Sequence, residues 1–349
     1  MKYDRKTFLR VKKLTQLLQG KSYMLIVMQD NPDPDSIAAA VALRKLANSI
    51  ADVPCTIACG GTVGRAENRA LVRYLGLKLH RCSEIEFEKF DLIGMVDTQP
   101  GTGNNSLPEG IMPDIVIDHH PLRRSTREAE LVDIRSRYGA TATVLLEYLK
   151  RAGITPEAQL ATALLYAIRS DTQDLGREAS KADIEAVTFL YPIANKRMLG
   201  EIQRGSVERG YFQMLAEALK SARVYGSCII AGLGAIDNPD MIAEVADLLL
   251  RDDETMCTIC YGFAQSKMLL SVRTCEPDMR ADRIIRQIVA RRGTGGGHQT
   301  YAGGQIPLKS DAKSEITKLE KAICRKIMRI LGLSQNQEQS LVQSRPIGR

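Results

Sequence analysis

Short apolar runs and amphipathic stretches alternate along the first half of the chain. Apolar runs of strand length occupy residues 23–28, 55–59, 92–96 and 114–117, and helical patterns occupy residues 4–19, 37–48, 139–149 and 158–168. Brief, fully apolar runs that alternate with helices are typical of a parallel sheet whose two faces are both covered. The pattern therefore predicts an α/β fold with a doubly wound parallel sheet in this half of the chain.

A different order of elements begins near residue 195. After a mainly helical stretch that runs to Leu219, strand patterns occupy residues 223–233, 256–264 and 268–273, and helical patterns occupy residues 241–250, 281–291 and 312–331. These elements predict a second, smaller α/β domain. We place the two domains at residues 1–195 and 216–333, with a helical linker at 196–215 and a polar, disordered tail at 334–349.

Length, charge and cysteine content limit the class of protein to which the chain can belong. With 349 residues, 44% of them hydrophobic, the chain is long enough for two compact cores. The net charge of +7 fits an anionic ligand, and it fits an evenly basic surface equally well. No apolar run is long enough to cross a bilayer, and the start lacks the apolar core of a signal peptide. We therefore expect a cytoplasmic protein without membrane contacts, whose eight cysteines are reduced thiols.

Side chains that can bind a metal ion follow the strand-like runs. In chain order they are Gln29, Asp33, Asp35, Asp97, Asp118, His119, His120 and, at the end of a helical pattern, Asp171. A lone Asp-x-Asp would be no more than a capped turn. Sites of open parallel sheets, however, form outside the carboxyl ends of the strands, so these side chains can converge. Several carboxylates with one or two imidazoles suit Mn²⁺ or Mg²⁺.

The order of these motifs resembles a known family. Pro-Asp-x-Asp, a strand that ends in Asp, Asp-His-His and Ser-Asp-Thr follow one another as in the DHH phosphoesterases, and Gly295-Gly296-Gly297-His298 resembles the DHHA1-type second domain of that family. The layout is most similar to the branch that contains nanoRNases, pAp phosphatases and dinucleotide phosphodiesterases. The resemblance implies an N-terminal DHH domain, a DHHA1-type C-terminal domain and an active site in the cleft between them.

The resemblance also implies a role for each candidate residue. Two Mn²⁺ ions are expected, with Mg²⁺ or another divalent ion as an alternative, and Asp97 would bridge them. Asp35, His119 and Asp171 would complete one ion site, and Asp33 would serve the other. Asp118 would orient the adjacent imidazole, and His120 would contact the scissile phosphate. The substrate phosphate would be bound from the second domain by Arg273, Gly295, Gly296, Gly297 and His298.

One position departs from the pattern of the family. Gln29 stands where the family has a histidine, four residues before Asp33. An amide oxygen is a weaker ligand for Mn²⁺ than an imidazole. We therefore expect the Asp33 site to be weakly occupied, to select another ion, or to borrow a ligand such as Asp30.

Two basic segments have two interpretations each. The glycine-rich turn at residues 60–64, followed by Arg65, would either present amides and a guanidinium to phosphate or serve as a flexible turn. Arg123, Arg124 and Arg127, beyond His120, would either contact the substrate or form a solvated loop. The sequence does not decide between these interpretations.

The favoured function is that of a metal-dependent phosphoesterase. Its substrate would be a short RNA or DNA oligonucleotide, a linear dinucleotide or pAp. The sparse aromatic residues, with no Trp, argue against a stacking groove for long single strands. The alternatives are a catalytically weakened, nucleotide-binding regulator and a hydrolase of pyrophosphate or polyphosphate. The sequence does not fix the oligomeric state, and a homodimer is one option.

Overall fold

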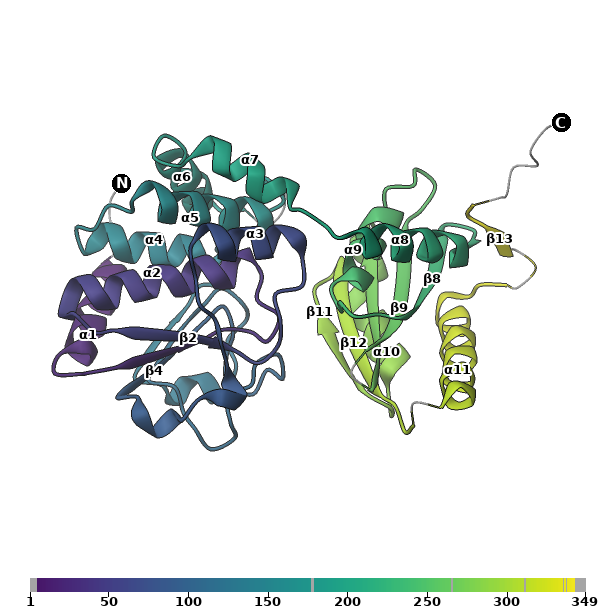
Figure 1. Cartoon of the computed structure of the whole chain (residues 1–349), viewed down its shortest axis with the longest axis horizontal. Coiled ribbons are helices and arrows are strands. Elements are labelled where there is room, and N and C mark those ends of the chain that lie inside the picture. The colour runs from purple at the N-terminus through teal and green to yellow at the C-terminus, as the bar shows by residue number, and fades with distance from the viewer. Residues whose placement is uncertain are drawn as a thin grey trace. The chain divides into compact units, whose positions relative to one another are not determined.

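The computed structural model describes residues 5–176, 179–264, 266–310, 312–334, 336 and 338–342. The chain divides into two compact units, Met1–Ser206 and Val207–Arg349 (Figure 1). Each unit has its own sheet and its own hydrophobic clusters.

The N-terminal unit is built on a six-stranded sheet. The strands are β1 (Met24–Val27), β2 (Cys55–Cys59), β3 (His80–Arg81), β4 (Leu92–Val96), β5 (Ile115–Asp118) and β6 (Leu131–Ile134). Their order is β3-β2-β1-β4-β5-β6, and all neighbours pair in parallel. The chain order reverses between β1 and β4, which makes the carboxyl ends of these two strands the topological switch point where such sheets bind ligands.

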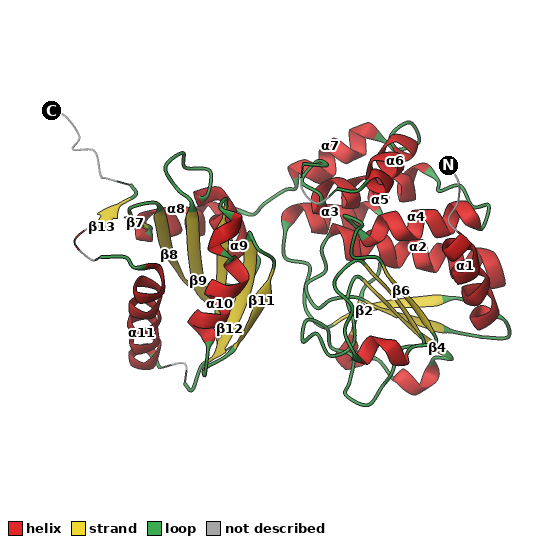
Figure 2. Ribbon diagram, turned by 180° about the vertical axis from the view of Figure 1, so that it is seen from behind, coloured by secondary structure: helices red, strands yellow, loops and turns green. Residues whose placement is uncertain are grey.

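The two faces of this sheet are covered differently. The α-helices are α1 (Arg5–Leu18), α2 (Pro34–Ala51), α3 (Ala66–Tyr74), α4 (Thr141–Arg151), α5 (Ala158–Asp171), α6 (Lys181–Leu190) and α7 (Lys196–Arg204). Their buried residues pack with Met24 and Ile26 of β1. The opposite face, with Leu25 and Val27, is covered by loops and short 3₁₀ helices, among them η2 (Phe87–Lys89) (Figure 2). Because both faces are covered, β1 is buried throughout, which explains its uninterrupted apolar sequence.

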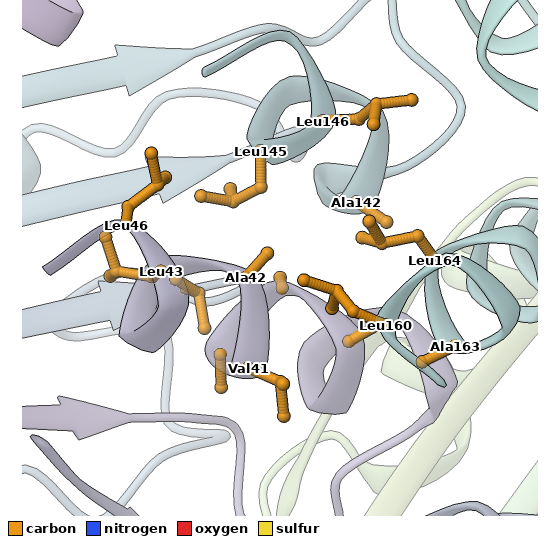
Figure 3. Close-up of a cluster of buried hydrophobic side chains, with 14 of the residues drawn as sticks. Val41, Ala42, Leu43, Leu46, Ala142, Leu145, Leu146, Leu160, Ala163 and Leu164 are labelled. Atoms are coloured by element: carbon orange, nitrogen blue, oxygen red, sulfur yellow. The ribbon is translucent and has the colours of Figure 1, made fainter. Parts of the chain in front are cut away.

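The packing of α2, α4 and α5 positions the polar edge of the sheet. Figure 3 shows Ala42 and Leu43 of α2 beside Leu145 of α4, and Leu160 and Leu164 of α5. The small residues of α2 let the neighbouring helices approach closely. The first turns of α2 and α4 and the last turn of α5 are thereby held in fixed places.

The C-terminal unit has a seven-stranded mixed sheet. The strands are β7 (Arg223–Tyr225), β8 (Cys228–Ala235), β9 (Cys257–Ala264), β10 (Lys267–Thr274), β11 (Thr294–Gly297), β12 (Tyr301–Pro307) and β13 (Glu338–Ser340), in the order β11-β12-β10-β9-β8-β7-β13. Only β8 and β9 pair in parallel among the strands described. One face packs against α10 (Ala281–Val289) and α11 (Lys313–Leu331), and the other against α8 (Arg209–Ser221) and α9 (Met241–Leu249).

Several details differ from the predictions. The predicted linker consists of α7, which packs with the N-terminal unit, and α8, which packs with the C-terminal unit, joined by residues 205–208. Residues 338–340 of the predicted disordered tail form β13, which pairs with β7, whereas residues 335, 337 and 343–349 lie outside the described part. Among the helices described, none is both long and apolar enough to span a membrane.

Candidate metal centre

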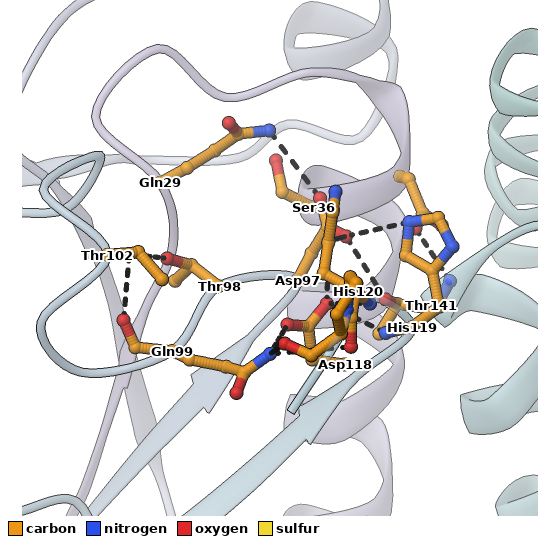
Figure 4. Close-up of polar contacts among 12 residues, drawn as sticks. Gln29, Ser36, Asp97, Thr98, Gln99, Thr102, Asp118, His119, His120 and Thr141 are labelled. Atoms are coloured by element: carbon orange, nitrogen blue, oxygen red, sulfur yellow. Dashed lines mark hydrogen bonds and ion pairs between the residues drawn. The ribbon is translucent and has the colours of Figure 1, made fainter. Parts of the chain in front are cut away.

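The metal-binding candidates of the N-terminal unit meet at the carboxyl edge of its sheet. Asp97 follows β4, Asp118 ends β5, and His119 comes next. Asp35 lies in the first turn of α2, and Asp171 is the last residue of α5. Figure 4 shows Asp97 surrounded by the histidines, Asp118 and Thr141. The sequence predicted this convergence, and the packing of the helices on the sheet produces it.

Asp97 is the central carboxylate of this cluster. The residue is 2% exposed, and its Oδ1 accepts a hydrogen bond of 3.1 Å from the Thr141 hydroxyl. Burial, followed by the charges of Asp33 and Asp35, raises its pKa well above the ordinary value. Its backbone has a φ of 56°, in the left-handed region that residues other than glycine rarely adopt. Strain of this kind is concentrated at functional sites.

Asp35 is bound by the start of α4. Its two oxygens accept hydrogen bonds from the backbone N–H groups of Thr141 and Ala142, at 2.7 and 2.8 Å. Helix α4 has no side-chain cap of its own, so Asp35 satisfies N–H groups that would otherwise lack a partner. Burial nevertheless raises the pKa of Asp35, against the opposing effect of His119.

His119 presents a lone pair to the carboxylates. Its Nδ1 lies 3.1 Å from the Tyr138 carbonyl oxygen, which only a protonated Nδ1 can satisfy. Its Nε2 then carries no proton in the neutral ring, and it lies 3.6 Å from Asp97 Oδ1 and 3.3 Å from Asp171 Oδ2. Within the described part of the chain, this Nε2 is buried without a hydrogen-bond partner. An imidazole lone pair beside two carboxylates is a donor set that a divalent metal ion prefers, so these residues fit such an ion.

The possible ligand atoms are also close enough to share an ion. One ligand atom from each of Asp35, His119 and Asp171 lies within 4.8 Å of the others. Asp97, Asp118, His119 and His120 form a second such group. Asp118, however, pairs directly with the His120 ring and backbone, so we propose that it orients His120 rather than binding the ion.

Asp118 holds His120 in place. Its Oδ1 accepts hydrogen bonds from the His120 N–H at 3.1 Å and from His120 Nδ1 at 2.9 Å. Burial works against the charged form of Asp118, but the hydrogen bond and charge of His120 outweigh it and lower the pKa to about 2. The pKa of His120 is correspondingly raised, despite the burial of the ring.

Gln99 is a residue of the site that the sequence analysis missed. It is 1% exposed, and its Nε2 donates to Asp118 Oδ2 at 2.7 Å. Its position two residues after Asp97 is the only signal in the sequence, and a glutamine in a loop gives no sign of burial.

Gln29 and Asp33 are the remaining metal-binding candidates of this unit. The Gln29 amide nitrogen is 3.5 Å from Asp97 Oδ2, and Asp33 caps α2 by accepting from the Ser36 N–H at 2.9 Å. Asp30, the other possible ligand, accepts a hydrogen bond from the Gly60 N–H at 3.1 Å through its Oδ1. The ligand set of a second ion therefore stays a prediction.

The substrate-binding candidates have local partners. Arg65 lies 4.0 Å from Glu67 at the start of α3. In the C-terminal unit, the His298 ring stacks on Tyr301 at 4.5 Å, and the Arg273 guanidinium lies 5.8 Å from the centre of the same ring. Arg273 also pairs with Asp247 at 2.5 Å. Whether these residues bind phosphate stays a prediction.

The glycine run, predicted to bind the substrate phosphate, forms a strand. Residues 294–297 make up β11 at the edge of the sheet, paired with β12. A Cβ at Gly295 would lie 3.2 Å from side chains of Ile285 and Val289 in α10, whereas one at Gly296 would meet open space. Gly295 therefore serves helix packing, and Gly296 leaves the edge accessible.

The N-terminal unit is thus an α/β domain with a candidate metal centre at its switch point. Residues 24–168 match the DHH family, N-terminal domain. The chain therefore contains a DHH-family N-terminal domain over these residues.

Similar proteins span much of the chain. An uncharacterized protein of Methanocaldococcus jannaschii is 35% identical over 92% of this chain, which spans 66% of that protein's length. A probable manganese-dependent inorganic pyrophosphatase of Bacillus cereus is 24% identical over 64% of this chain and 75% of its own. A solved structure, an exopolyphosphatase-related protein from Bacteroides fragilis, superposes with a TM-score of 0.71 at 12% identity, over 93% of this chain and 98% of that one. This last likeness concerns the fold, and it includes both predicted α/β domains.

Proposed function

We propose that the protein is a metal-dependent phosphoesterase that hydrolyses short oligonucleotides, linear dinucleotides or pAp to mononucleotides. The observation that carries this proposal is the buried Nε2 of His119, which faces Asp97 and Asp171 without a hydrogen-bond partner among the described residues. A purely structural histidine would be satisfied at both nitrogens. The match of residues 24–168 to the DHH family supports the same chemistry.

The ion of choice is Mn²⁺, with Mg²⁺ as the alternative. Asp35, His119 and Asp171, together with Asp97, would hold one ion, and Asp33 and Gln29 would share Asp97 to hold a second. The chemistry that such ions supply is activation of water and polarisation of the phosphoryl group. The name of the Bacillus cereus relative, a manganese-dependent enzyme, supports the choice of ion.

The chain's own residues supply orientation and proton donation. Asp118 binds His120 Nδ1 at 2.9 Å, which leaves Nε2 as the atom of His120 that can donate to a phosphoryl oxygen. Thr141 holds the Asp97 carboxylate in its orientation at 3.1 Å. Arg273 and His298 would bind a substrate phosphate from the C-terminal unit. We propose a DHHA1-type role for that unit on the strength of these two residues and Gly296.

A second candidate is hydrolysis of inorganic pyrophosphate. The observation that favours it is the similarity to probable inorganic pyrophosphatases over 64% of this chain. Both candidates use the same metal centre, so the substrate must be tested directly.

The deciding experiment compares pApA and pyrophosphate as substrates with Mn²⁺ or Mg²⁺. The test variant is Asp97→Asn, and the matched control is Asp91→Asn, because Asp91 lies directly before β4 whereas Asp97 lies directly after it. Release of AMP that needs metal and Asp97, but not Asp91, is the expected result. Cleavage of pyrophosphate alone would select the second candidate. Binding of pApA without cleavage would select the nucleotide-binding regulator instead.

A further inference from the structure

Three exposed arginines follow His120 closely along the chain. Arg123, Arg124 and Arg127 lie on residues 121–128, which we call the arginine loop. Among the described residues, these three side chains form no ion pair that would neutralise them. Arg124 and Arg127 are three residues apart at and within the 3₁₀ helix η3 (Ser125–Glu128), so their side chains project from the same side. The loop thus presents three guanidinium groups to solvent against one carboxylate, that of Glu128.

The arginine loop is anchored to the candidate active site. Gln99 Oε1 accepts hydrogen bonds from the Arg123 N–H at 2.8 Å and from the Thr126 hydroxyl at 2.7 Å. The Nε2 of the same Gln99 donates to Asp118 Oδ2 at 2.7 Å. Gln99 and Thr126 are 1% and 0% exposed. One buried amide therefore connects the backbone of the loop to the carboxylate that holds His120.

A second contact fixes the same loop. The Ser125 hydroxyl donates to the Pro100 carbonyl at 2.6 Å. The nearby Glu130 is engaged elsewhere, because it pairs with Lys13 at 3.0 Å. A loop that only served solubility would need neither a buried amide nor a fixed backbone. The anchoring instead holds unneutralised charge at the edge of the site.

We propose that the arginine loop binds phosphates of a nucleotide chain next to the scissile phosphate. The inference rests on the proposed function and predicts that, within its substrate class, oligonucleotides longer than a dinucleotide bind more tightly. Guanidinium groups bind phosphodiesters through paired N–H donors, and they do so independently of base sequence. Pyrophosphate and pAp have too few phosphate groups to contact three arginines and the metal ions at the same time.

The test measures binding of oligoadenylates of two and five nucleotides in an Asp97→Asn background, where cleavage is prevented. The test variant replaces Arg123, Arg124 and Arg127 by alanine. The matched control replaces Lys12, Lys196 and Arg197, exposed basic residues of α1 and α7, and removes the same charge. Each lost phosphate contact is expected to reduce the slope of log affinity against log salt by about 0.7. We expect a loss of about two in slope for the five-nucleotide chain, and little change for the dinucleotide or in the control.

Equal slopes for the test and control variants with the five-nucleotide chain would overturn the inference. A variant with lysines at the three positions keeps the charge and is expected to keep the slope; loss of the slope there would also overturn the inference. Circular dichroism establishes that each variant is folded. The two proposals fail separately: absence of Asp97-dependent hydrolysis refutes the proposed function, whereas unchanged oligonucleotide binding refutes only the role of the loop.

Discussion

Replacement of Arg135 by methionine is expected to destabilise the N-terminal unit. Arg135 donates to both oxygens of Asp133 at 2.9–3.1 Å, to Glu147 Oε2 at 2.6 Å and to the Tyr138 hydroxyl at 3.2 Å. The side chains of Arg135 and Asp133 are 9% and 0% exposed. The substitution would leave buried carboxylates without their principal cation.

The size of the expected loss of stability depends on the partners that Asp133 keeps. Removal of one partner of a buried ion pair costs about 3–5 kcal/mol. Asp133 keeps the Arg10 guanidinium at 2.6 Å and the Tyr148 hydroxyl at 2.9 Å. We therefore expect the lower end of that range, about 3 kcal/mol. Arg137→Met is the matched control, because Arg137 is exposed and only two residues away.

The same substitution is expected to weaken metal binding. The Tyr138 hydroxyl is held by Arg135 and Glu147, and the Tyr138 carbonyl oxygen accepts from His119 Nδ1. Loss of such an outer partner of a metal ligand typically costs 10–100-fold in affinity, and we expect about tenfold because the carbonyl itself remains.

Hydrogen exchange of peptides from β6 and α4 under increasing urea reports the stability of this unit alone, and titration calorimetry reports Mn²⁺ affinity. A loss of less than about 1 kcal/mol, which an exposed ion pair would give, would refute the assignment of Arg135 as a buried structural cation. A loss of stability with unchanged Mn²⁺ affinity would refute the link through Tyr138 to His119.

Three further predictions concern other parts of the molecule. Metal-free protein is expected to lose stability as the pH rises through the raised pKa of Asp97. The increase in melting temperature on adding Mn²⁺ is therefore expected to be larger at pH 8 than at pH 5.5. An equal increase at the two pH values would contradict this prediction. Gln99→Leu is expected to cost about 1–3 kcal/mol and to lower the rate of pApA hydrolysis, because its buried partners lose their hydrogen bonds; thermal denaturation and kinetics measure both effects. Gly304→Ala is expected to destabilise the C-terminal unit by about 1–3 kcal/mol, because the added Cβ would lie 2.8 Å from Ile285. Gly303→Ala is the control, because a Cβ at Gly303 would lie 3.8 Å from its nearest neighbour. Equal urea midpoints for the two variants would contradict this prediction.

The central strands were predictable from the sequence because burial on both faces produces an uninterrupted apolar run. The apolar runs at 23–28, 92–96 and 114–117 correspond to β1, β4 and β5 within one or two residues. Strands buried on both faces admit no polar residue until they end, so Asp97 and Asp118 mark the edge of the sheet. Because the alternation of strands and helices predicts a parallel sheet, it also predicts that the side chains of Asp97 and Asp118 lie at the same edge.

Other features depended on contacts that no local pattern records. Whether Gly295 lies in a loop or a strand is decided by its pairing with β12 and its packing on α10. The role of Thr141 depends on the approach of α4 to Asp35 and Asp97, and that of Gln99 depends on a loop more than twenty residues away along the chain. Glycines, threonines and glutamines are common in loops, so their sequence signal is the same with or without such contacts.

The two sides of Asp97 are not equally prepared for a metal ion. On the His119 side, an imidazole lone pair and the Asp171 carboxylate already face inward, and His119 is fixed through Tyr138. On the other side, Gln29 directs its N–H₂ group toward Asp97 Oδ2, and this group must turn before the amide oxygen can serve a cation. Any ion on that side must therefore displace a hydrogen bond, whereas an ion beside His119 satisfies an atom that lacks one. We accordingly expect the ion held by Asp35, His119 and Asp171 to bind first, and the replacement of a histidine by Gln29 to weaken the second ion without preventing the first.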